Sequence, residues 1–329
     1  MQRSYLTYSR NVFLPLTNVC RNRCAYCIFR EPVKDGCIMK EEDVLDTLHK
    51  GASFGCTEAL FTFGEKPELE PGFSGYLKKS GYSSILDFCY SMCKKACEAG
   101  LLPHTNAGIL DYNELERLKE VNASMGLMLE TTAVIPAHRN SPGKDPDVRI
   151  AMIEDAGKLR IPFTTGLLLG IGEKMSDREE SLETIEGIHR RYGNIQEIII
   201  QNFCPKPGTD MEKWPVPKTE EICETLRLAN EILSGDISIQ IPPNLIDASL
   251  LIDCGVDDLG GVSPVTVDYV NPEHPWPAIS ELKKIAGKRK LKERLCIYRK
   301  YIDLGWYPPG LKVLIDKLNK DIHNRSDII

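Results

Sequence analysis

Three cysteines lie close together near the start of the chain, in the run Leu16-Thr17-Asn18-Val19-Cys20-Arg21-Asn22-Arg23-Cys24-Ala25-Tyr26-Cys27. Their spacing is C-x3-C-x2-C, and the run follows directly on an apolar segment, residues 12–16. A loop this short can direct three thiolates to one point, and thiolate is the ligand that soft metals and iron–sulfur clusters select. Three ligands are one fewer than a closed zinc site or a fully ligated four-iron cluster requires. We therefore predict a metal centre with one position left open for chemistry.

The composition narrows the class of protein. At 329 residues the chain has room for two ordinary domains or for one α/β barrel with extensions. The net charge of −6 argues against a nucleic-acid partner, and no apolar run is long enough to span a membrane. The first ten residues lack the apolar core of a signal peptide. We therefore expect a cytoplasmic protein with no nucleic-acid or membrane partner.

The chain has 12 cysteines, which we interpret as metal ligands or buried thiols rather than as a disulfide scaffold. Cys89, Cys93 and Cys97 repeat at intervals of four residues within a helical pattern. That spacing places them on one helical face, where cysteine behaves as a small hydrophobic residue. We predict that these three pack in the core.

Short apolar runs alternate with amphipathic helical patterns along the chain. Such alternation favours a parallel sheet closed into a TIM-type (β/α) barrel. No linker or shift of composition divides the chain, so we predict one domain, residues 1–329, with a barrel core at about 9–277 and a helical C-terminal extension at 278–329. We expect the extension to form surface helices broken at Pro308 and Pro309. The expected strands are residues 12–16, 59–64, 101–109, 123–130, 162–170, 197–203, 238–241 and 258–262, and the expected helices are 41–53, 85–99, 111–120, 147–159, 177–191, 219–233 and 248–254.

The three-cysteine spacing, with the aromatic Tyr26 directly before the last cysteine, resembles the signature of the radical S-adenosylmethionine (SAM) enzymes. In that superfamily three cysteines hold a [4Fe-4S] cluster, and SAM chelates the fourth iron through its amino and carboxylate groups. The resemblance implies that Cys20, Cys24 and Cys27 ligate such a cluster and that Tyr26 contacts SAM. A zinc-binding structural barrel with a distant fourth ligand, such as Cys37, is the alternative outside this class.

Two strand ends carry further likenesses to this superfamily. Gly64 and Glu65 close the second expected strand, where the superfamily places a glycine-rich motif against the amino group of SAM. Residues 166–173 resemble its G-x-I-x-G-x-x-E stretch, which implies that Gly170 and Ile171 lie near the adenine; Leu168 replaces the usual isoleucine. The alternative for Gly64 and Glu65 is a plain solvent loop. The alternative for residues 166–173 is a glycine-rich strand end that binds no ligand.

Two charged residues extend the implied SAM site. Glu130 ends the fourth expected strand, and a carboxylate there can accept hydrogen bonds from the ribose hydroxyls. Arg149 opens the following helix and could hold the SAM carboxylate in a bidentate pair. The alternatives are an ordinary ion pair for Glu130 and a surface position for Arg149.

The remaining polar strand ends face the expected substrate position, since chemistry in such barrels occurs at the carboxyl ends of the strands. Amides and hydroxyls suit a neutral, hydroxyl-rich ligand better than a phosphate. A structural histidine is the alternative reading of His104. The candidate substrate residues are His104, Asn106, Gln201, Asn202 and Asn244.

Longer stretches resemble one family within the superfamily, that of CofG, the radical SAM subunit of 7,8-didemethyl-8-hydroxy-5-deazariboflavin (FO) synthase. They are residues 61–68, 102–108, 124–130, 138–142, 161–166, 201–203, 260–266 and 271–277. The resemblance implies conversion of 5-amino-5-(4-hydroxybenzyl)-6-(D-ribitylimino)-5,6-dihydrouracil to FO with release of ammonia. It also implies a CofH-type partner enzyme that makes this substrate, and a reductant protein such as ferredoxin or flavodoxin.

Neighbouring radical SAM enzymes are the alternatives within the same chemistry. CofH-like and menaquinone-pathway enzymes usually carry a Gly-Gly pair where this chain has Phe63 and Gly64. A sulfur inserter resembling biotin synthase would need ligands for a second cluster, and no second compact cysteine group is visible outside the helix that carries Cys89.

Overall fold

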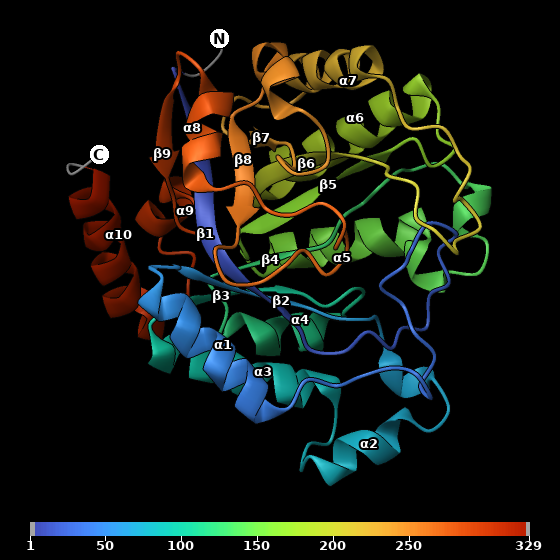
Figure 1. Cartoon of the computed structure of the whole chain (residues 1–329), viewed down its shortest axis with the longest axis vertical. Coiled ribbons are helices and arrows are strands. Elements are labelled where there is room, and N and C mark those ends of the chain that lie inside the picture. Colours follow the sequence, from blue (N-terminus) through green and yellow to red (C-terminus); the bar gives the residue numbers. More distant parts are fainter. Residues whose placement is uncertain (1–3, 327–329) are drawn as a thin grey trace.

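In the computed structural model, which describes residues 4–326, eight parallel strands close into a barrel. The strands follow one another around the barrel in chain order from β2 to β8, and β1 closes the ring by pairing with both β8 and β2. Figure 1 shows the helices on the outside of the strands, with α1 and α3 on one side and α6 and α7 on the opposite side. The prediction of a (β/α) barrel is confirmed.

The elements alternate as expected along the chain. The strands are β1 (Tyr5–Pro15), β2 (Glu58–Thr62), β3 (Leu102–Asn106), β4 (Ser124–Gly126), β5 (Phe163–Leu169), β6 (Ile195–Asn202), β7 (Ser238–Gln240), β8 (Asp258–Val262) and β9 (Lys290–Glu293). The helices are α1 (Glu41–Ser53), α2 (Phe73–Lys79), α3 (Ile85–Ala99), α4 (Tyr112–Lys119), α5 (Pro146–Lys158), α6 (Met175–Tyr192), α7 (Thr219–Ile232), α8 (Ile279–Ala286), α9 (Arg299–Asp303) and α10 (Lys312–Ser326).

Strand β1 begins seven residues earlier than the apolar run that marked it, at Tyr5 rather than at residue 12. The reason is that Ser9 and Asn11 are buried inside the barrel although they are polar. Polar side chains that face an interior cavity interrupt the apolar pattern from which strands are predicted. The early part of β1 therefore shows that the interior of the barrel contains polar side chains.

Helix α3 buries the cysteine-bearing face that its spacing predicts. Cys89 and Cys93 are fully buried together with Met92, and Cys97 is half-buried against the cluster formed by the C-terminal segment. The side chain of Ser84 caps the helix by accepting a hydrogen bond from the Asp87 amide. These thiols are packing groups, as predicted.

The C-terminal segment differs from the expected surface helices. It contains strand β9, which pairs in parallel with β1, and it buries Leu295, Tyr301 and Ile315 against residues at the start of β3 and just before β4. Figure 1 shows α9 and α10 beside the amino-terminal part of β1. The many charged residues of this segment concealed the strand, and the apolar ones cover the floor of the barrel, which is its amino-terminal end.

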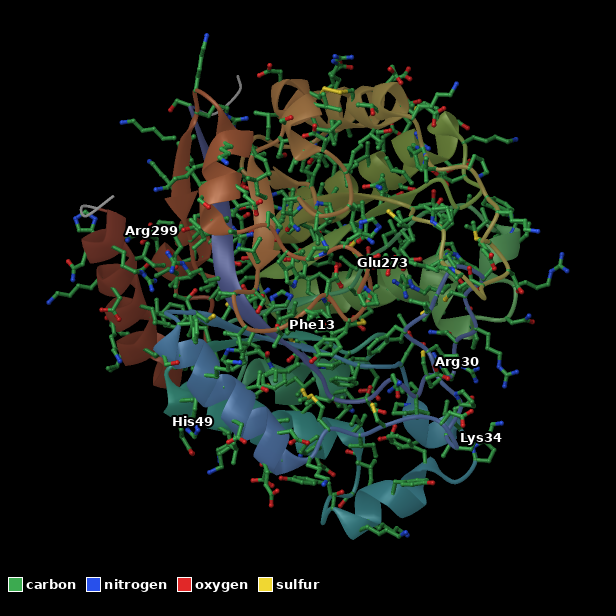
Figure 2. All side chains as sticks on the ribbon, viewed as in Figure 1. Phe13, Arg30, Lys34, His49, Glu273 and Arg299 are labelled. Carbon is green, nitrogen blue, oxygen red and sulfur yellow. A yellow bond between two sulfur atoms is a disulfide. The ribbon has the colours of Figure 1, made fainter. Side chains whose placement is uncertain are left out.

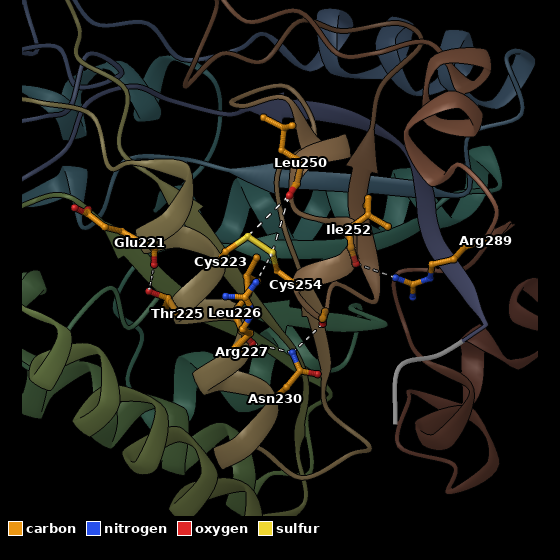
Figure 3. Close-up of a disulfide and its surroundings, with 11 residues drawn as sticks. Glu221, Cys223, Thr225, Leu226, Arg227, Asn230, Leu250, Ile252, Cys254 and Arg289 are labelled. Carbon is orange, nitrogen blue, oxygen red and sulfur yellow. Dashed lines mark hydrogen bonds between the residues drawn. A yellow bond between two sulfur atoms is a disulfide. The ribbon is translucent and has the colours of Figure 1, made fainter.

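Two cysteines depart from the expectation of metal ligands or buried thiols. Cys223 in the first turn of α7 and Cys254 form a disulfide, with their Cα atoms 5.3 Å apart (Figure 3). The expected helix at 248–254 is replaced by two 3-10 turns, Ala248–Leu250 and Ile252–Cys254, and the second turn brings Cys254 to α7. Because the partners are 31 residues apart, their pairing depended on a tertiary contact that the sequence pattern does not reveal.

No helix within residues 4–326 combines the length and the apolar character that a membrane span needs.

Candidate active site at the carboxyl end of the barrel

The cysteine loop leaves β1 at the carboxyl end of the barrel. Cys20, Cys24 and Cys27 are free, partly exposed, and line one cavity. Gly64 at the end of β2 lies against the loop so closely that a Cβ there would be 2.0 Å from the carbonyl oxygen of Val19. Only glycine permits this approach. The strand end thus fixes the position of the loop that carries the thiols.

Hydrogen bonds from neighbouring groups reach two of the sulfur atoms. The Glu65 amide donates to Sγ of Cys20 at 3.2 Å, and the Ser141 hydroxyl donates to Sγ of Cys24 at 3.3 Å. Burial raises the pKa of Cys20 to about 11 and also raises the pKa of Cys27. A cationic centre bound beside these thiols would compensate the burial and favour their thiolate forms.

The three thiols line one cavity but do not converge on one point. Within residues 4–326 no three His, Cys, Asp or Glu side chains converge closely enough to ligate one metal ion. Three thiolates on a four-iron cluster bind three different iron atoms and therefore stand further apart than the ligands of one zinc ion. Cys37, the alternative fourth ligand, is exposed and lines a different cavity.

Glu130 lies at the centre of a buried ionic network beside the thiols. Its carboxylate accepts the Tyr26 hydroxyl, pairs with Lys144, and lies 3.1 Å from Nε2 of His138. Burial opposes the charge of Glu130, but Lys144, His138 and Arg149 outweigh it and hold the pKa of Glu130 well below its usual range. The carboxylate is therefore ionised and borders the cavity.

The backbone of Glu130 is also unusual, because its φ of 68° lies in the left-handed region. For a residue with a side chain this conformation costs free energy, and such strain is concentrated at functional sites. Arg149 is only 3% exposed, so the surface alternative for it is wrong. Its guanidinium donates to the carbonyl oxygens of Gly143 and Met128 and borders the same cavity.

Glu65 is buried and has partners on both carboxylate oxygens. Nε of Arg21 donates to Oε1 at 2.8 Å, and the Ile109 amide donates to Oε2 at 3.1 Å. Together with Gly64, Glu65 lines the thiol cavity, which excludes the plain solvent loop for this strand end.

The glycine-rich end of β5 is shaped by Glu173. Its carboxylate accepts the amides of Gly170 and Ile171, both at 2.8 Å, and it pairs with Arg178 at 2.7 Å. Gly170 has a φ of 91°, which favours glycine. Leu168 lines the thiol cavity, whereas Gly170 and Ile171 do not.

A second cavity lies deeper inside the barrel. Asn106 and Gln201 border both cavities, so the two are adjacent. His104 and Asn244 line the deeper cavity, and Asn202 lines the thiol cavity. The five candidate substrate residues therefore all line one or both of these adjacent cavities.

The deeper cavity also contains charged residues that the sequence prediction missed. Glu58 and Glu197 line it, and Arg294 enters from the C-terminal segment. The guanidinium of Arg294 pairs with Glu197 and with Asp258, both at 2.6 Å. Burial raises the pKa of Glu197 to about 8, which Arg294 partly opposes. Glu197, which interrupts an otherwise apolar strand, was the sequence feature from which a charged group in the barrel could have been predicted.

The remaining lining is mixed, because apolar side chains share it with Thr164, Gln240, Asp268 and Asn271. Phe13, which Figure 2 shows near the middle of the molecule, lines the deeper cavity with Leu60, Ile199 and Trp276. Its ring centroid lies 5.7 Å from that of Tyr269. A ligand in this space meets thiols at the mouth, apolar side chains in the middle and charged groups at the floor.

Comparisons with known proteins agree with this geometry. Residues 14–185 match the model of the radical SAM superfamily. The chain is 63% identical, over 99% of both chains, to "7,8-didemethyl-8-hydroxy-5-deazariboflavin synthase" of Methanoregula boonei. It is also 63% identical to the protein of the same name from Methanoculleus marisnigri, over 98% of this chain and 97% of the relative.

A solved structure shares the fold at low sequence identity. The FeFe-hydrogenase maturase HydG from Carboxydothermus hydrogenoformans superimposes with a TM-score of 0.69 and 17% identity, over 99% of this chain and 79% of that chain. The full-length relatives identify the family more narrowly than the shared barrel does. The chain belongs to the radical SAM superfamily and, within it, to the family of 7,8-didemethyl-8-hydroxy-5-deazariboflavin synthases.

Proposed function

We propose that this chain converts 5-amino-5-(4-hydroxybenzyl)-6-(D-ribitylimino)-5,6-dihydrouracil to FO. The observation that carries the proposal is the 63% identity to FO synthases over the whole chain, together with three free thiols at the mouth of a deep polar cavity. As a radical SAM protein the chain uses a [4Fe-4S] cluster and SAM. When bound, these supply a 5′-deoxyadenosyl radical that removes a hydrogen atom from the substrate.

The reaction balances as an oxidative ring closure. A bond forms between the imino nitrogen and the phenol ring, and the bond from carbon to the 5-amino group breaks. One hydrogen leaves as an atom to the deoxyadenosyl radical. A second leaves as a proton, which departs with ammonia as ammonium, and the bound cluster would accept the electron that this hydrogen leaves behind.

The protein's own groups hold and orient the reactants. Cys20, Cys24 and Cys27 are the proposed cluster ligands. The ionised Glu130 provides acceptors for the ribose hydroxyls of SAM. The other residues proposed to surround SAM are Tyr26, Gly64, Glu65 and Arg149, with Gly170 and Ile171 shaping the backbone at the end of β5.

The proposal extends to partners that must act before and beside this enzyme. An enzyme of the CofH type supplies the substrate, and a reductant protein such as ferredoxin or flavodoxin supplies the electron that starts the reaction. We propose that all three act in the cytoplasm.

An anaerobic assay tests the proposed function. The iron-reconstituted protein is incubated with SAM, a reductant and the CofH product, and both 5′-deoxyadenosine and deazaflavin fluorescence are measured. We expect both to appear together. Deoxyadenosine without the fluorophore would indicate another radical SAM reaction, and a colourless zinc-loaded protein without either product would indicate the structural alternative.

A further inference from the structure

The inner surface of the barrel changes from polar to apolar in the same direction on three strands. Each strand contributes a polar residue and, two or four residues further toward the thiols, an apolar one. The pairs are Ser9 and Phe13 on β1, Glu58 and Leu60 on β2, and Glu197 and Ile199 on β6, and all six residues line the deeper cavity. The floor and the middle of this cavity therefore favour different parts of a ligand.

Asn11, near the floor of the deeper cavity, has a side-chain oxygen without a hydrogen-bond partner. Its side chain is 1% exposed and lines the cavity, and its Oδ1 has no hydrogen-bond partner. A buried polar atom without a partner costs free energy unless a ligand satisfies it. Asn11 pairs in register with Glu58 on the neighbouring strand, so the unused acceptor lies close to the floor carboxylates.

The hydrogen bonds of His104 define which ring nitrogen is free. The Ser124 hydroxyl donates its only proton to the carbonyl oxygen of Cys296 at 2.9 Å. Its oxygen lies 2.7 Å from Nδ1 of His104, so Nδ1 must be the donor of that bond. His104 therefore carries its proton on Nδ1, and Nε2 keeps a lone pair. That nitrogen lies near Gly126 and Asn106, within the wall of the cavity.

We propose that this floor binds the polyhydroxylated (ribityl) arm of the substrate, with Asn11 and His104 as direct hydrogen-bonding residues. The inference rests on the proposed function and adds the orientation of the substrate. Each hydroxyl group donates one hydrogen bond and accepts others, which matches a floor that combines acceptors with the guanidinium N–H donors of Arg294. The aryl ring is placed in the apolar middle zone, and the reacting carbon faces the thiol end.

The C-terminal segment belongs to the substrate site in this arrangement. It supplies Arg294, which fixes the floor carboxylates, and the Cys296 carbonyl, which fixes the tautomer of His104 through Ser124. The extension is thus a determinant of specificity as well as a cover for the barrel.

A pair of substrates tests the proposal. One is the natural adduct, and the other is the same adduct with the ribityl chain shortened to hydroxyethyl. We expect Asn11→Leu to lower kcat/KM for the natural adduct by roughly tenfold, because a buried hydrogen bond to the substrate is lost. The same variant should leave kcat/KM for the shortened adduct unchanged.

Asn194→Leu is the matched control. Asn194 is also fully buried with an unpartnered Oδ1, but it lines neither the thiol cavity nor the deeper one. Its loss should affect both substrates equally. If Asn11→Leu does not fold, His104→Gln with the same two substrates decides the question.

The outcomes separate this inference from the function on which it rests. An equal loss on both adducts, with active wild-type enzyme, overturns the floor as the ribityl site and leaves the ring closure in place. A wild-type enzyme that forms no deazaflavin from the natural adduct overturns both.

Discussion

The two ends of this barrel use polar groups in opposite ways. At the carboxyl end, three free and partly exposed thiols come from one loop and have few partners within the protein. At the floor, the Arg294 side chain is only 11% exposed and pairs with Glu197 and Asp258, which come from distant parts of the chain. The thiols contribute little to folding because they are held ready for a cofactor. The charged groups at the floor form ion pairs with one another, so the stability of the fold depends on them.

The largest expected effect comes from the thiol end. Cys24→Ser should abolish SAM cleavage, because serine cannot replace a thiolate ligand of iron. The free energy of unfolding of the cluster-free protein should change little, because Cys24 is half-exposed and free. The assay measures 5′-deoxyadenosine, and urea unfolding measures the stability.

Cys37→Ser is the matched control, since Cys37 is exposed and lines another cavity. It should retain full activity. Loss of activity in Cys37→Ser, or normal activity in Cys24→Ser, would contradict the assignment of the three ligands.

A substitution at the floor should instead change the free energy of unfolding of the protein. Arg294→Met leaves Glu197 and Asp258 buried without their cation, which typically costs about 3–5 kcal/mol. Urea unfolding of the cluster-free protein measures the difference. Arg299→Met is the control, because Arg299 makes an exposed pair with Asp303 and lies at the surface in Figure 2. Its effect should stay below about 1 kcal/mol. If both variants lost the same free energy of unfolding, the buried network at the floor would stabilise the protein no more than an exposed ion pair does.

The disulfide on the outer wall provides a third, smaller test. Replacing Cys223 and Cys254 together by serine should lower the free energy of unfolding by about 2–4 kcal/mol, because the cross-link restricts the unfolded chain. SAM cleavage at low temperature should remain, since neither residue lines the thiol cavity or the deeper cavity. Thermal unfolding with and without a thiol reductant measures the effect. The wild-type protein under reduction should resemble the double variant.

The same contrast explains how far the sequence could predict this structure. The thiol end was predictable because its ligands lie within eight residues and follow a strand directly, so spacing alone indicated them. The alternation of apolar runs likewise predicted the barrel and every strand from β1 to β8.

The floor was not predictable in that way. Ser9, Glu58, Glu197 and Arg294 are far apart in the chain and meet only because the barrel closes and β9 adds to β1. Apart from Glu197, which interrupts the apolar strand β6, each looks like an ordinary surface residue when read locally. The pairing of Cys223 with Cys254 depended on tertiary packing for the same reason.

The smallest effect concerns His104, which lies between the two ends. Burial, and then the nearby Arg294, lower the pKa of His104 to about 3, whereas an unfolded histidine titrates near 6.5. Between these values the unfolded chain binds the proton and the folded protein excludes it. The stability from this group is therefore fully present above about pH 6.5 and is lost as the pH falls, by up to about 1.4 kcal/mol per pH unit. Urea unfolding of the cluster-free protein at pH 7 and pH 5 should show this loss, and His104→Gln should lack it. His49→Gln, at an exposed position on α1, should keep the wild-type slope. A His104→Gln variant with the wild-type slope would mean that folding does not lower the pKa of His104, which would then take up a proton below about pH 6.5. Its Nε2 would then carry a proton and could not accept a hydrogen bond from the substrate.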